Sequence, residues 1–155
     1  MTIGSAIIGP EGGHAAGRKL LKKLYEAEFG AAMPPIVTTP LGKPYFAEGN
    51  VHFSISHTPN HVFCVLSDKP VGIDAEETDR QIRLELAEKI LSPTEAIRYA
   101  QAEDKRQTLL RLWVLKEAEA KCTGAGLQGY PNHTDYFPDD PRITEMNGCF
   151  VAVIE

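Results

Sequence analysis

The sequence predicts an α+β fold in which a largely antiparallel sheet packs against helices. Strand-like segments separated by short turns cover residues 51–57, 62–66 and 71–76. Segments with helical spacing follow, and residues 142–155 form a strand pair around the turn signal Asn147-Gly148. Strands grouped before and after a block of helices are typical of α+β proteins.

Length and composition suit one globular domain. The chain has 155 residues, of which 43% are hydrophobic and 24% charged, and it can bury a sizeable core. The net charge of −5 argues against broad affinity for nucleic acid, because that affinity needs a basic surface. No apolar run approaches the roughly 18 residues of a membrane helix. We therefore expect no nucleic-acid partner and no membrane partner.

Two further features indicate a cytoplasmic protein. Residues 1–10 carry no basic residue before their short apolar run, so they do not resemble a signal peptide. Cys64, Cys122 and Cys149 form no C-x-x-C pair, which favours reduced thiols. We expect the chain to act in the cytoplasm.

The first organised element is a helix at about residues 15–29, after a short strand at residues 3–8. Three leucines form its apolar stripe: Leu20, Leu21 and Leu24. Four basic residues lie on the rest of its surface: Arg18, Lys19, Lys22 and Lys23. Two interpretations stay open, namely a solvated face with a Lys22–Glu26 pair, which we favour, or a helix that contacts phosphate. Residues 31–44, rich in Pro and Thr, predict a loop.

The middle of the chain predicts three strands. Residues 51–57 alternate between two faces, residues 62–66 are wholly apolar, and residues 71–76 form a third strand. The turns at Pro59-Asn60 and at residues 68–70 are short. We therefore expect these strands to be antiparallel neighbours.

Three helices are expected next. Apolar residues at helical spacing predict the first over residues 82–91. Ser92-Pro93-Thr94-Glu95 is a capping box with proline at the first helical position, so the second helix begins there and runs to about residue 100. The third covers about residues 104–122 and ends at Gly124 and Gly126.

The third strand carries the first candidate site. Gly72, Asp74 and Glu76 are two residues apart, so they share one face, while the apolar residues between them face the core. Two neighbouring carboxylates repel each other and therefore need a compensating cation. Carboxylates combined with water and substrate phosphates suit Mg²⁺. Because exposed acids are common at strand ends, this pattern alone is weak.

The second candidate site lies on the helix expected at residues 104–122. Trp113, Glu117 and Lys121 are spaced i, i+4, i+8 and therefore line one stripe. The aromatic side chain on this stripe suggests that Glu117 lies at the edge of the core. On spacing alone, an amphipathic helix with one surface ion pair explains the pattern better.

The histidines do not indicate a metal site. His57 and His61 are four residues apart, which on a helix would suit Zn²⁺. Pro59 lies between them and the preceding pattern is a strand, so we set a zinc site aside. We expect no ligand among the remaining histidines: His14, His52 and His133.

Several motifs in order make these signals specific. G-I-D-x-E at residues 72–76 is followed about forty residues later by W-x-x-K-E-A-x-x-K at residues 113–121. This combination resembles the 4′-phosphopantetheinyl transferases, specifically the surfactin-type branch. Further segments resemble the family's motifs in the same order: Gly42-Lys43-Pro44, His52-Phe53-Ser54-Ile55-Ser56-His57, Leu91-Ser92-Pro93-Thr94-Glu95 and Gly124-Ala125-Gly126-Leu127. The resemblance spans residues 42–127 and implies a 4′-phosphopantetheinyl transferase-like fold.

The resemblance also implies an activity and a set of site residues. The family transfers the phosphopantetheine arm of coenzyme A to a serine of an acyl or peptidyl carrier protein and releases adenosine 3′,5′-bisphosphate. By their places in the motifs, Asp74, Glu76 and Glu117 would be Mg²⁺ ligands. Glu117 would also act as a catalytic base, directly or through a water, and Lys121 would stabilise phosphate charge. The residues that would bind coenzyme A are Lys43, Pro44, Ser56 and His57. Lys116 lies inside the motif, and the resemblance gives it no clear role.

The chain departs from the family pattern in its N-terminal portion. Surfactin-type enzymes are pseudo-twofold, and their first half supplies part of the coenzyme A site. Here only residues 1–41 precede the first motif, so we expect a single domain over residues 1–155 with a reduced N-terminal portion. The basic residues of the first helix, or a second copy of the chain in a homo-oligomer, would complete the site.

Two other functions stay open. A non-catalytic module that binds coenzyme A or a carrier protein would be expected to lack a metal ligand or Lys121, and the sequence retains them all. A metal-dependent phosphohydrolase would use the same acids, but it leaves Gly42-Lys43-Pro44 and Ser56-His57 unexplained. We therefore favour the transferase.

Overall fold

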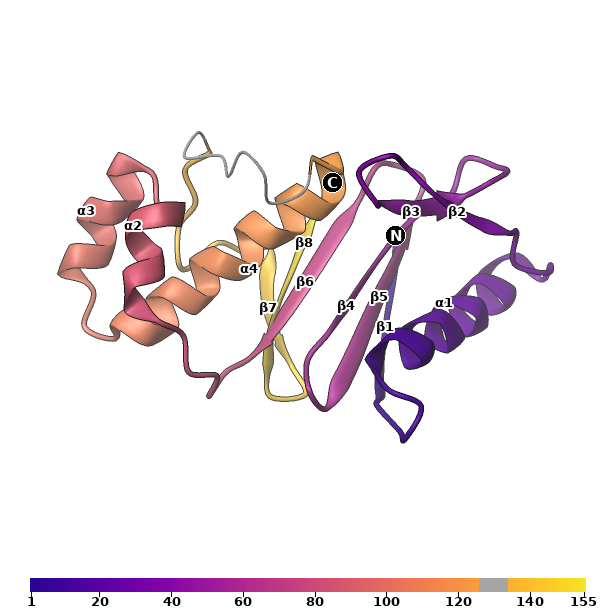
Figure 1. Ribbon diagram of the computed structural model, residues 1–155, viewed down its shortest axis with the longest axis horizontal. Coiled ribbons are helices and arrows are strands. Elements are labelled where there is room, and N and C mark those ends of the chain that lie inside the picture. The colour runs from indigo at the N-terminus through magenta and orange to yellow at the C-terminus, as the bar shows by residue number, and fades with distance from the viewer. Residues whose placement is uncertain (126–133) are drawn as a thin grey trace.

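The computed structural model describes residues 1–125 and 134–155 (Figure 1). In chain order the elements are β1 (Thr2–Ile7), α1 (Gly13–Phe29), β2 (Ile36–Thr38), β3 (Pro44–Phe46), β4 (His52–His57), β5 (His61–Ser67), β6 (Gly72–Glu77), the 3₁₀ helix η1 (Leu84–Leu86), α2 (Ala87–Ile90), α3 (Pro93–Gln101), α4 (Lys105–Thr123), β7 (Ile143–Met146) and β8 (Cys149–Ile154). Antiparallel sheets packed with helices confirm the predicted α+β class.

Two antiparallel sheets and two long helices form four layers (Figure 1). The sheet β1-β5-β4 is covered by α1, and the sheet β6-β8-β7 is covered by α4. β5 is buried on both faces. Its side chains Val62, Cys64 and Leu66 pack in one core cluster with α1. Phe63 and Val65 pack against the other sheet, which explains why residues 62–66 of this strand are all apolar.

The two halves of the chain share one topology. Each half is a strand, a helix and a hairpin, and the last strand of the hairpin pairs with the first strand of the half: β1-α1-β4-β5 and β6-α4-β7-β8. The first half adds the small β2–β3 hairpin, and the second half inserts η1, α2 and α3 before α4. The fold therefore contains a repeat that is not evident in the sequence.

β4 and β6 lie side by side where the halves meet. The Ser54 hydroxyl oxygen accepts a hydrogen bond from the Ile73 amide (3.1 Å), and the Ser56 hydroxyl oxygen accepts one from the Ala75 amide (3.2 Å). β6 is the edge strand of its sheet, so these hydroxyls satisfy amide groups that a neighbouring strand would otherwise bind. We call this contact between β4 and β6 the seam.

The structure differs from the prediction in the pairing of the middle strands. β4 and β5 are antiparallel neighbours as expected, but β6 pairs with β8 and not with β5. Both edges of β5 are already occupied, by β1 and β4, so β6 joins the second sheet.

Two predicted segments are also revised. Residues 31–44, expected to be a loop, contain β2 and the first residue of β3. These strands have three residues each, which is too short for an alternating pattern. The helix expected over residues 82–91 is shortened to η1 and α2, because the chain stays extended through Arg83.

Several local predictions are confirmed. α1, α3 and α4 lie within two residues of their expected bounds, and Ser92 and Glu95 form the predicted capping box. The β7–β8 turn has positive φ angles at Asn147 (53°) and Gly148 (71°), as a type I′ turn requires. Gly124 ends α4 in the left-handed conformation (φ 72°). Three residues named above lie outside the described part: Gly126, Leu127 and His133.

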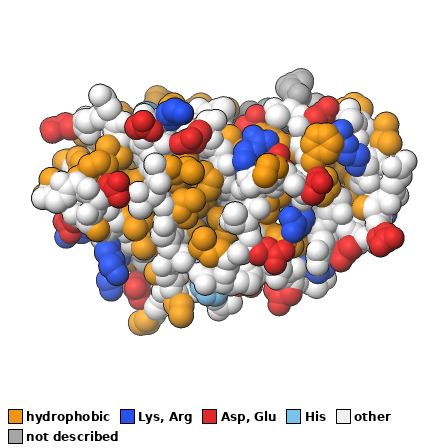
Figure 2. Space-filling model, turned by 180° about the vertical axis from the view of Figure 1, so that it is seen from behind, with side chains coloured by type: hydrophobic (Ala, Val, Ile, Leu, Met, Phe, Trp, Pro, Cys, Tyr) orange, Lys and Arg blue, Asp and Glu red, His pale blue; other side chains and the backbone are white. Residues whose placement is uncertain are grey.

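The surface carries charges of both signs. Figure 2 shows basic and acidic side chains interspersed with hydrophobic ones on the face behind the view of Figure 1. On α1, Lys22 and Glu26 form the expected ion pair (3.0 Å). None of the described helices has the length and apolar character needed to cross a membrane.

Candidate active site

Helix α4 packs directly against the face of β6 that carries the acids. Gly72 permits this contact, because a Cβ atom there would lie 1.9 Å from the Ala118 carbonyl oxygen and 2.4 Å from the Cys122 amide nitrogen. A larger residue would force the helix away from the strand. Asp74 and Glu76 follow Gly72 on the same face of β6, as the alternation predicts.

Asp74 is buried, with 5% of the residue exposed. Its Oδ1 accepts hydrogen bonds from Lys121 Nζ (2.7 Å) and from Ser56 Oγ (2.9 Å). Its Oδ2 has no hydrogen-bond partner among the residues that the structure describes. Because a buried carboxylate oxygen without a partner is costly, this atom is a candidate ligand for a cation.

Glu76 lies farther along β6, where two side chains hold its carboxylate. Trp113 Nε1 donates a hydrogen bond to Glu76 Oε1 (3.2 Å), and the Arg80 guanidinium forms an ion pair with the same oxygen. Burial raises the pKa of Glu76 above its ordinary value, the hydrogen bond from Arg80 opposes this rise, and the charge of Asp74 adds to it. The raised pKa of Glu76 shows that burial disfavours its charged form, which a nearby cation would stabilise.

Glu117 lies between Trp113 and Lys121 on the stripe of α4 that faces β6. Trp113 reaches Glu76 and Lys121 reaches Asp74, so this stripe runs along the pair of acids. Within residues 1–125 and 134–155, no three His, Cys, Asp or Glu side chains lie close enough together to hold a metal ion. The three-ligand site therefore stays a prediction. The donor chemistry of Asp74 and Glu76 fits a hard divalent cation, since both supply carboxylate oxygens and one oxygen is buried without a partner.

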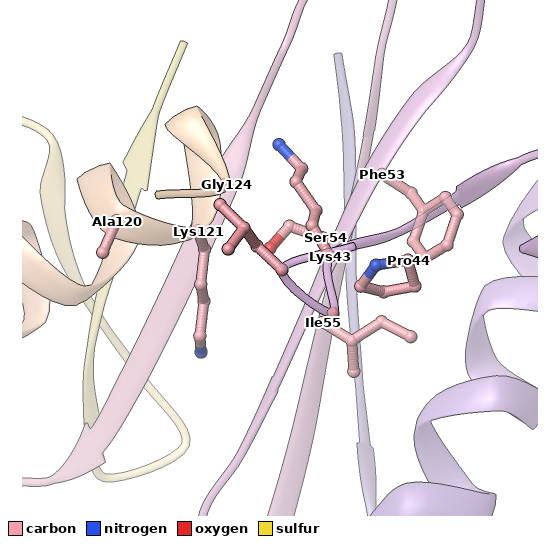
Figure 3. A pocket seen from close by; sticks show the side chains of 10 residues that line it. Lys43, Pro44, Phe53, Ser54, Ile55, Ala120, Lys121 and Gly124 are labelled. Carbon is pink, nitrogen blue, oxygen red and sulfur yellow. The ribbon is translucent and has the colours of Figure 1, made fainter. Parts of the chain in front are cut away.

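A cavity of about 240 Å³ opens beside Lys121 (Figure 3). Its walls come from the β2–β3 hairpin, β4 and the end of α4: Leu41, Gly42, Lys43, Pro44, Phe53, Ser54, Ile55, Ala120, Lys121 and Gly124. The structure thus brings the segment Gly42-Lys43-Pro44 next to the last lysine of the helical motif. Apolar walls with two lysines suit a ligand that has an apolar body and anionic groups.

Lys43 connects the β2–β3 hairpin to α4. Its ammonium donates a hydrogen bond to the Cys122 carbonyl, and its side-chain stem packs against Gly124. A cation is favourable at this position because the C-terminal end of a helix carries partial negative charge. Burial lowers the pKa of Lys43. A contact between Lys43 and coenzyme A stays a prediction.

Ser56 and His57 lie at the end of β4. Ser56 is buried at the seam, whereas His57 is exposed, and its ring packs against Gly13 in the first turn of α1. A cleft of about 390 Å³ joins His57 to the two glutamates at the end of β6, and its lining is His57, Thr58, Pro59, Glu76, Glu77 and Arg80. Contacts of Ser56 and His57 with coenzyme A stay predictions.

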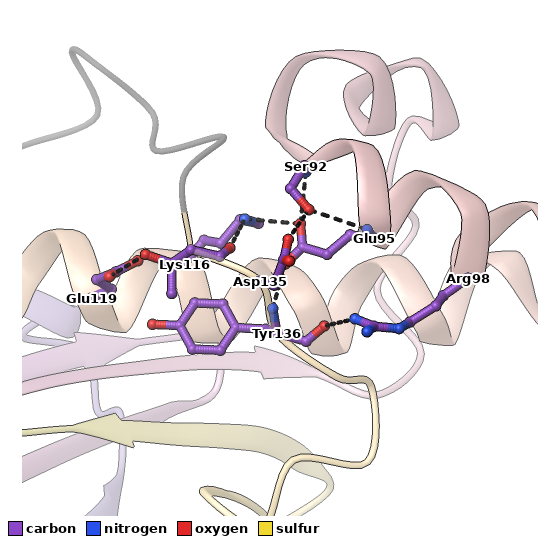
Figure 4. Close-up of polar contacts among 8 residues, drawn as sticks. Ser92, Glu95, Arg98, Lys116, Glu119, Asp135 and Tyr136 are labelled. Carbon is purple, nitrogen blue, oxygen red and sulfur yellow. Dashed lines mark hydrogen bonds and ion pairs between the residues drawn. The ribbon is translucent and has the colours of Figure 1, made fainter.

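A second polar cluster lies on another face of α4 (Figure 4). Lys116 and Glu95 form an ion pair (2.9 Å) in which both side chains are fully buried. Glu95 also accepts hydrogen bonds from the amides of Ser92 (2.9 Å) and Tyr136 (2.8 Å). Lys116 donates a further bond to the Thr134 carbonyl (3.2 Å). These contacts attach the chain after residue 133 to α3 and α4, so Lys116 belongs to the interior and not to the site.

Three features of the site and its surroundings were not predicted from the sequence: Arg80 beside Glu76, Ser54 at the seam and the buried Lys116–Glu95 pair. Arg80 is four residues from Glu76, but the strand ends between them, so no periodicity connects them. Ser54 shares a face with Ser56, and this alternation was the one available signal for the seam. The Lys116–Glu95 pair joins two helices, and spacing within one helix cannot reveal it.

Sequence comparison agrees with this geometry. The profile of the 4′-phosphopantetheinyl transferase superfamily matches residues 70–147, about half of the chain. The chain belongs to this superfamily. The matched segment of this transferase-superfamily member contains β6 and α4, and with them the predicted metal ligands and Lys121.

Similar proteins carry the family's name. The 4′-phosphopantetheinyl transferase of Bacillus subtilis is 36% identical over 89 residues, which are 56% of this chain and 39% of that protein. The 4′-phosphopantetheinyl transferase psf-1 of Bacillus pumilus is 31% identical over 134 residues, 83% of this chain and 57% of its own. A putative 4′-phosphopantetheinyl transferase of Haemophilus influenzae is 30% identical over 118 residues, 73% and 50% of the two chains. The superfamily member described here therefore spans 39% to 57% of the length of these relatives.

Proposed function

We propose that this protein transfers the 4′-phosphopantetheine arm of coenzyme A to a serine hydroxyl of an acyl or peptidyl carrier protein. One observation supports this most strongly: Asp74 and Glu76 on β6 face Lys121 and Trp113 on α4, beside a cavity that also contains Lys43. A neighbouring acid pair and a cavity with two lysines are what a diphosphate and a divalent cation require together.

Three acids would hold the metal: Asp74, Glu76 and Glu117. Mg²⁺ bound there would supply positive charge to the diphosphate of coenzyme A and so improve its leaving group. Asp74 Oδ2, for which the described residues offer no partner, supports this assignment, and so does the raised pKa of Glu76.

Glu117 would accept the serine proton, and Lys121 would stabilise the charge on the phosphate. The serine oxygen forms a bond to the phosphorus that carries pantetheine, and the bond from that phosphorus to adenosine 3′,5′-bisphosphate breaks. Glu117 takes the serine proton, directly or through a water. Lys121 neutralises charge that develops on the phosphate oxygens, from a position already bonded to Asp74.

Coenzyme A would be held mainly by the first half of the chain. Lys43 and Pro44 line the cavity beside Lys121. Ser56 and His57 lie at the end of β4, and His57 shares a cleft with Glu76. The Ser56 hydroxyl now donates a hydrogen bond to Asp74. It could therefore contact a phosphate only by giving up this bond or by forming an additional one.

The proposed partners are coenzyme A and an apo carrier protein, without nucleic acid or membrane. We place the activity in the cytoplasm, in keeping with three free cysteine thiols. Whether the active form is a monomer or a homo-oligomer depends on whether α1 supplies the remaining phosphate contacts.

Incubation with coenzyme A, Mg²⁺ and an apo carrier protein tests the proposal. The intact mass of the carrier should rise by one phosphopantetheine, and EDTA should prevent the change. Glu117→Gln removes the charge without changing the shape of the side chain, so the rate should fall by roughly 100-fold or more. Glu103→Gln makes the same change at an exposed position before α4 and should leave the rate unchanged.

The outcomes separate the three functions. A Glu117→Gln variant that modifies the carrier at the parent rate would show that Glu117 is neither ligand nor base. Binding of coenzyme A or carrier without any mass change would indicate a non-catalytic module. Release of phosphate from coenzyme A without modification of the carrier would indicate a phosphohydrolase.

A further inference from the structure

Arg80 is the cationic side chain that pairs with Glu76. Its guanidinium forms an ion pair with Glu76 Oε1, the oxygen that also accepts the Trp113 hydrogen bond. We propose that Arg80 is an internal counter-ion that competes with the divalent cation for Glu76 and leaves it when the cation binds. This inference rests on the proposed function, because it takes Glu76 as a metal ligand.

Hydrogen bonds hold the backbone around Arg80 in place. The Arg80 amide donates a hydrogen bond to the Glu77 carbonyl (2.9 Å). The Arg106 guanidinium, from the first turns of α4, donates to the Thr78 carbonyl (2.6 Å) and the Arg80 carbonyl (3.3 Å). α4 therefore fixes the turn after β6 and keeps the guanidinium within reach of Glu76.

The charges at the acid pair support an exchange. Lys121 neutralises Asp74 and Arg80 neutralises Glu76, so two monovalent cations now balance two carboxylates. A divalent cation bound at Glu76 would take the place of the single charge of Arg80, while Lys121 keeps its contact with Asp74. The Glu76 side chain is 13% exposed and the Arg80 side chain 45%, so the arginine can leave toward solvent while the acid stays in place.

The structure also provides space for the displaced side chain. Arg80 borders the cleft near His57 and a groove of about 580 Å³ that runs along η1 and α2. The groove is lined by the carboxylate of Glu85 and also by the cations Arg83 and Lys89. The Arg80 side chain therefore borders open space on two sides, into which it could turn while its backbone stays in place.

Mn²⁺ titration followed by electron paramagnetic resonance, without coenzyme A or carrier, tests the exchange directly. Arg80→Gln removes the competing charge, so Mn²⁺ should bind roughly three- to ten-fold more tightly than to the parent protein. Arg83→Gln removes the same charge from an exposed position in the same groove and should change the affinity less than about two-fold. Arg80→Lys keeps the charge and should bind Mn²⁺ within about two-fold of the parent protein.

The results distinguish this inference from the proposed function. Equal Mn²⁺ affinity in Arg80→Gln and Arg83→Gln, or weaker binding in Arg80→Gln, would overturn the role of Arg80 alone. A parent protein that binds no Mn²⁺ would overturn both this role and the assignment of the acids to a metal. Tighter binding that appears only in Arg80→Gln supports the exchange.

Discussion

The charged side chains of the K-E-A-E-A-K segment divide between two faces of α4. Glu117 and Lys121 lie on the stripe toward β6, where Lys121 contacts Asp74. Lys116 and Glu119 face the segment after residue 133, where Glu119 accepts a hydrogen bond from the Thr134 hydroxyl (2.8 Å). Residues of the same chemical type therefore have different surroundings within two helical turns: Lys121 pairs with Asp74 and borders the cavity, whereas Lys116 is part of the core.

Lys116→Met tests the structural role of the buried lysine. The change leaves Glu95 buried without its cation, and loss of one partner of a buried pair costs about 3–5 kcal/mol. The free energy of unfolding, measured by denaturant titration, should fall by that amount. The double variant Glu95→Gln with Lys116→Met retains no buried charge and keeps a side-chain oxygen as acceptor for the amides that bond Glu95, so it should be more stable than the single variant. Additive losses in the double variant would contradict the ion-pair account.

The ion pair between Asp140 and Arg142 allows a second test, based on how stability depends on pH. Two side-chain hydrogen bonds join them (2.8 and 2.6 Å), the Arg142 amide donates a third to Asp140 (2.9 Å), and Arg142 stacks on Tyr136 at 5.2 Å. The hydrogen bond from Arg142 lowers the pKa of Asp140 below its ordinary value of 3.8. A lowered pKa contributes stability above pH 3.8 that disappears as the pH falls through the folded-state value. Asp140→Asn should therefore be less stable than the parent at pH 7, and the difference should shrink below pH 3.8. A difference that stays constant down to pH 2.5 would exclude this explanation.

Among the elements, the contact between β6 and α4 decides the geometry of the site. Gly72 lets the helix backbone approach the strand, and this approach brings Lys121 to Asp74 and Trp113 to Glu76. The glycine of the G-I-D-x-E motif is thus explained by packing, because its φ is not in the left-handed region.

Gly72→Ala should separate the two elements. The added methyl group overlaps the Ala118 carbonyl, and such overpacking costs about 1–3 kcal/mol of unfolding free energy. Activity should fall as well, since the shift of α4 moves Lys121 from Asp74. The control Gly9→Ala places its methyl group only against the end of the flexible Glu11 side chain and should be neutral in both assays. An active, fully stable Gly72→Ala protein would show that the close approach is dispensable.

Patterns within one segment predict the elements well. The capping box at Ser92, the turn at Asn147 and the apolar run of β5 all depend on neighbouring residues, and each is confirmed. Contacts between distant segments cannot be predicted from such local patterns. The pairing of β6 with β8 joins residues about eighty positions apart, and Lys43 meets the end of α4 across a similar distance. For the site, the motifs identified the acids and Lys121, but not Arg80, which touches Glu76 through a turn that has no periodicity.

In the whole molecule, the two halves repeat one topology while their first strands carry different residues. Gly4 in β1 faces Leu24 of α1, much as Gly72 in β6 faces α4. Two positions beyond each glycine, β1 has Ala6 where β6 has Asp74. The repeat therefore shares its packing but not its chemistry, which explains why it cannot be recognised from the order of residues.

The seam affects how strongly the two halves of the chain are held together. The residues proposed for the nucleotide belong to the first half and those proposed for the metal to the second, and serine hydroxyls join the two strands that meet between them. A molecule bound across this boundary touches both sides, so its binding free energy adds to the attraction between them. Occupancy would thereby make the two repeats unfold as one cooperative unit.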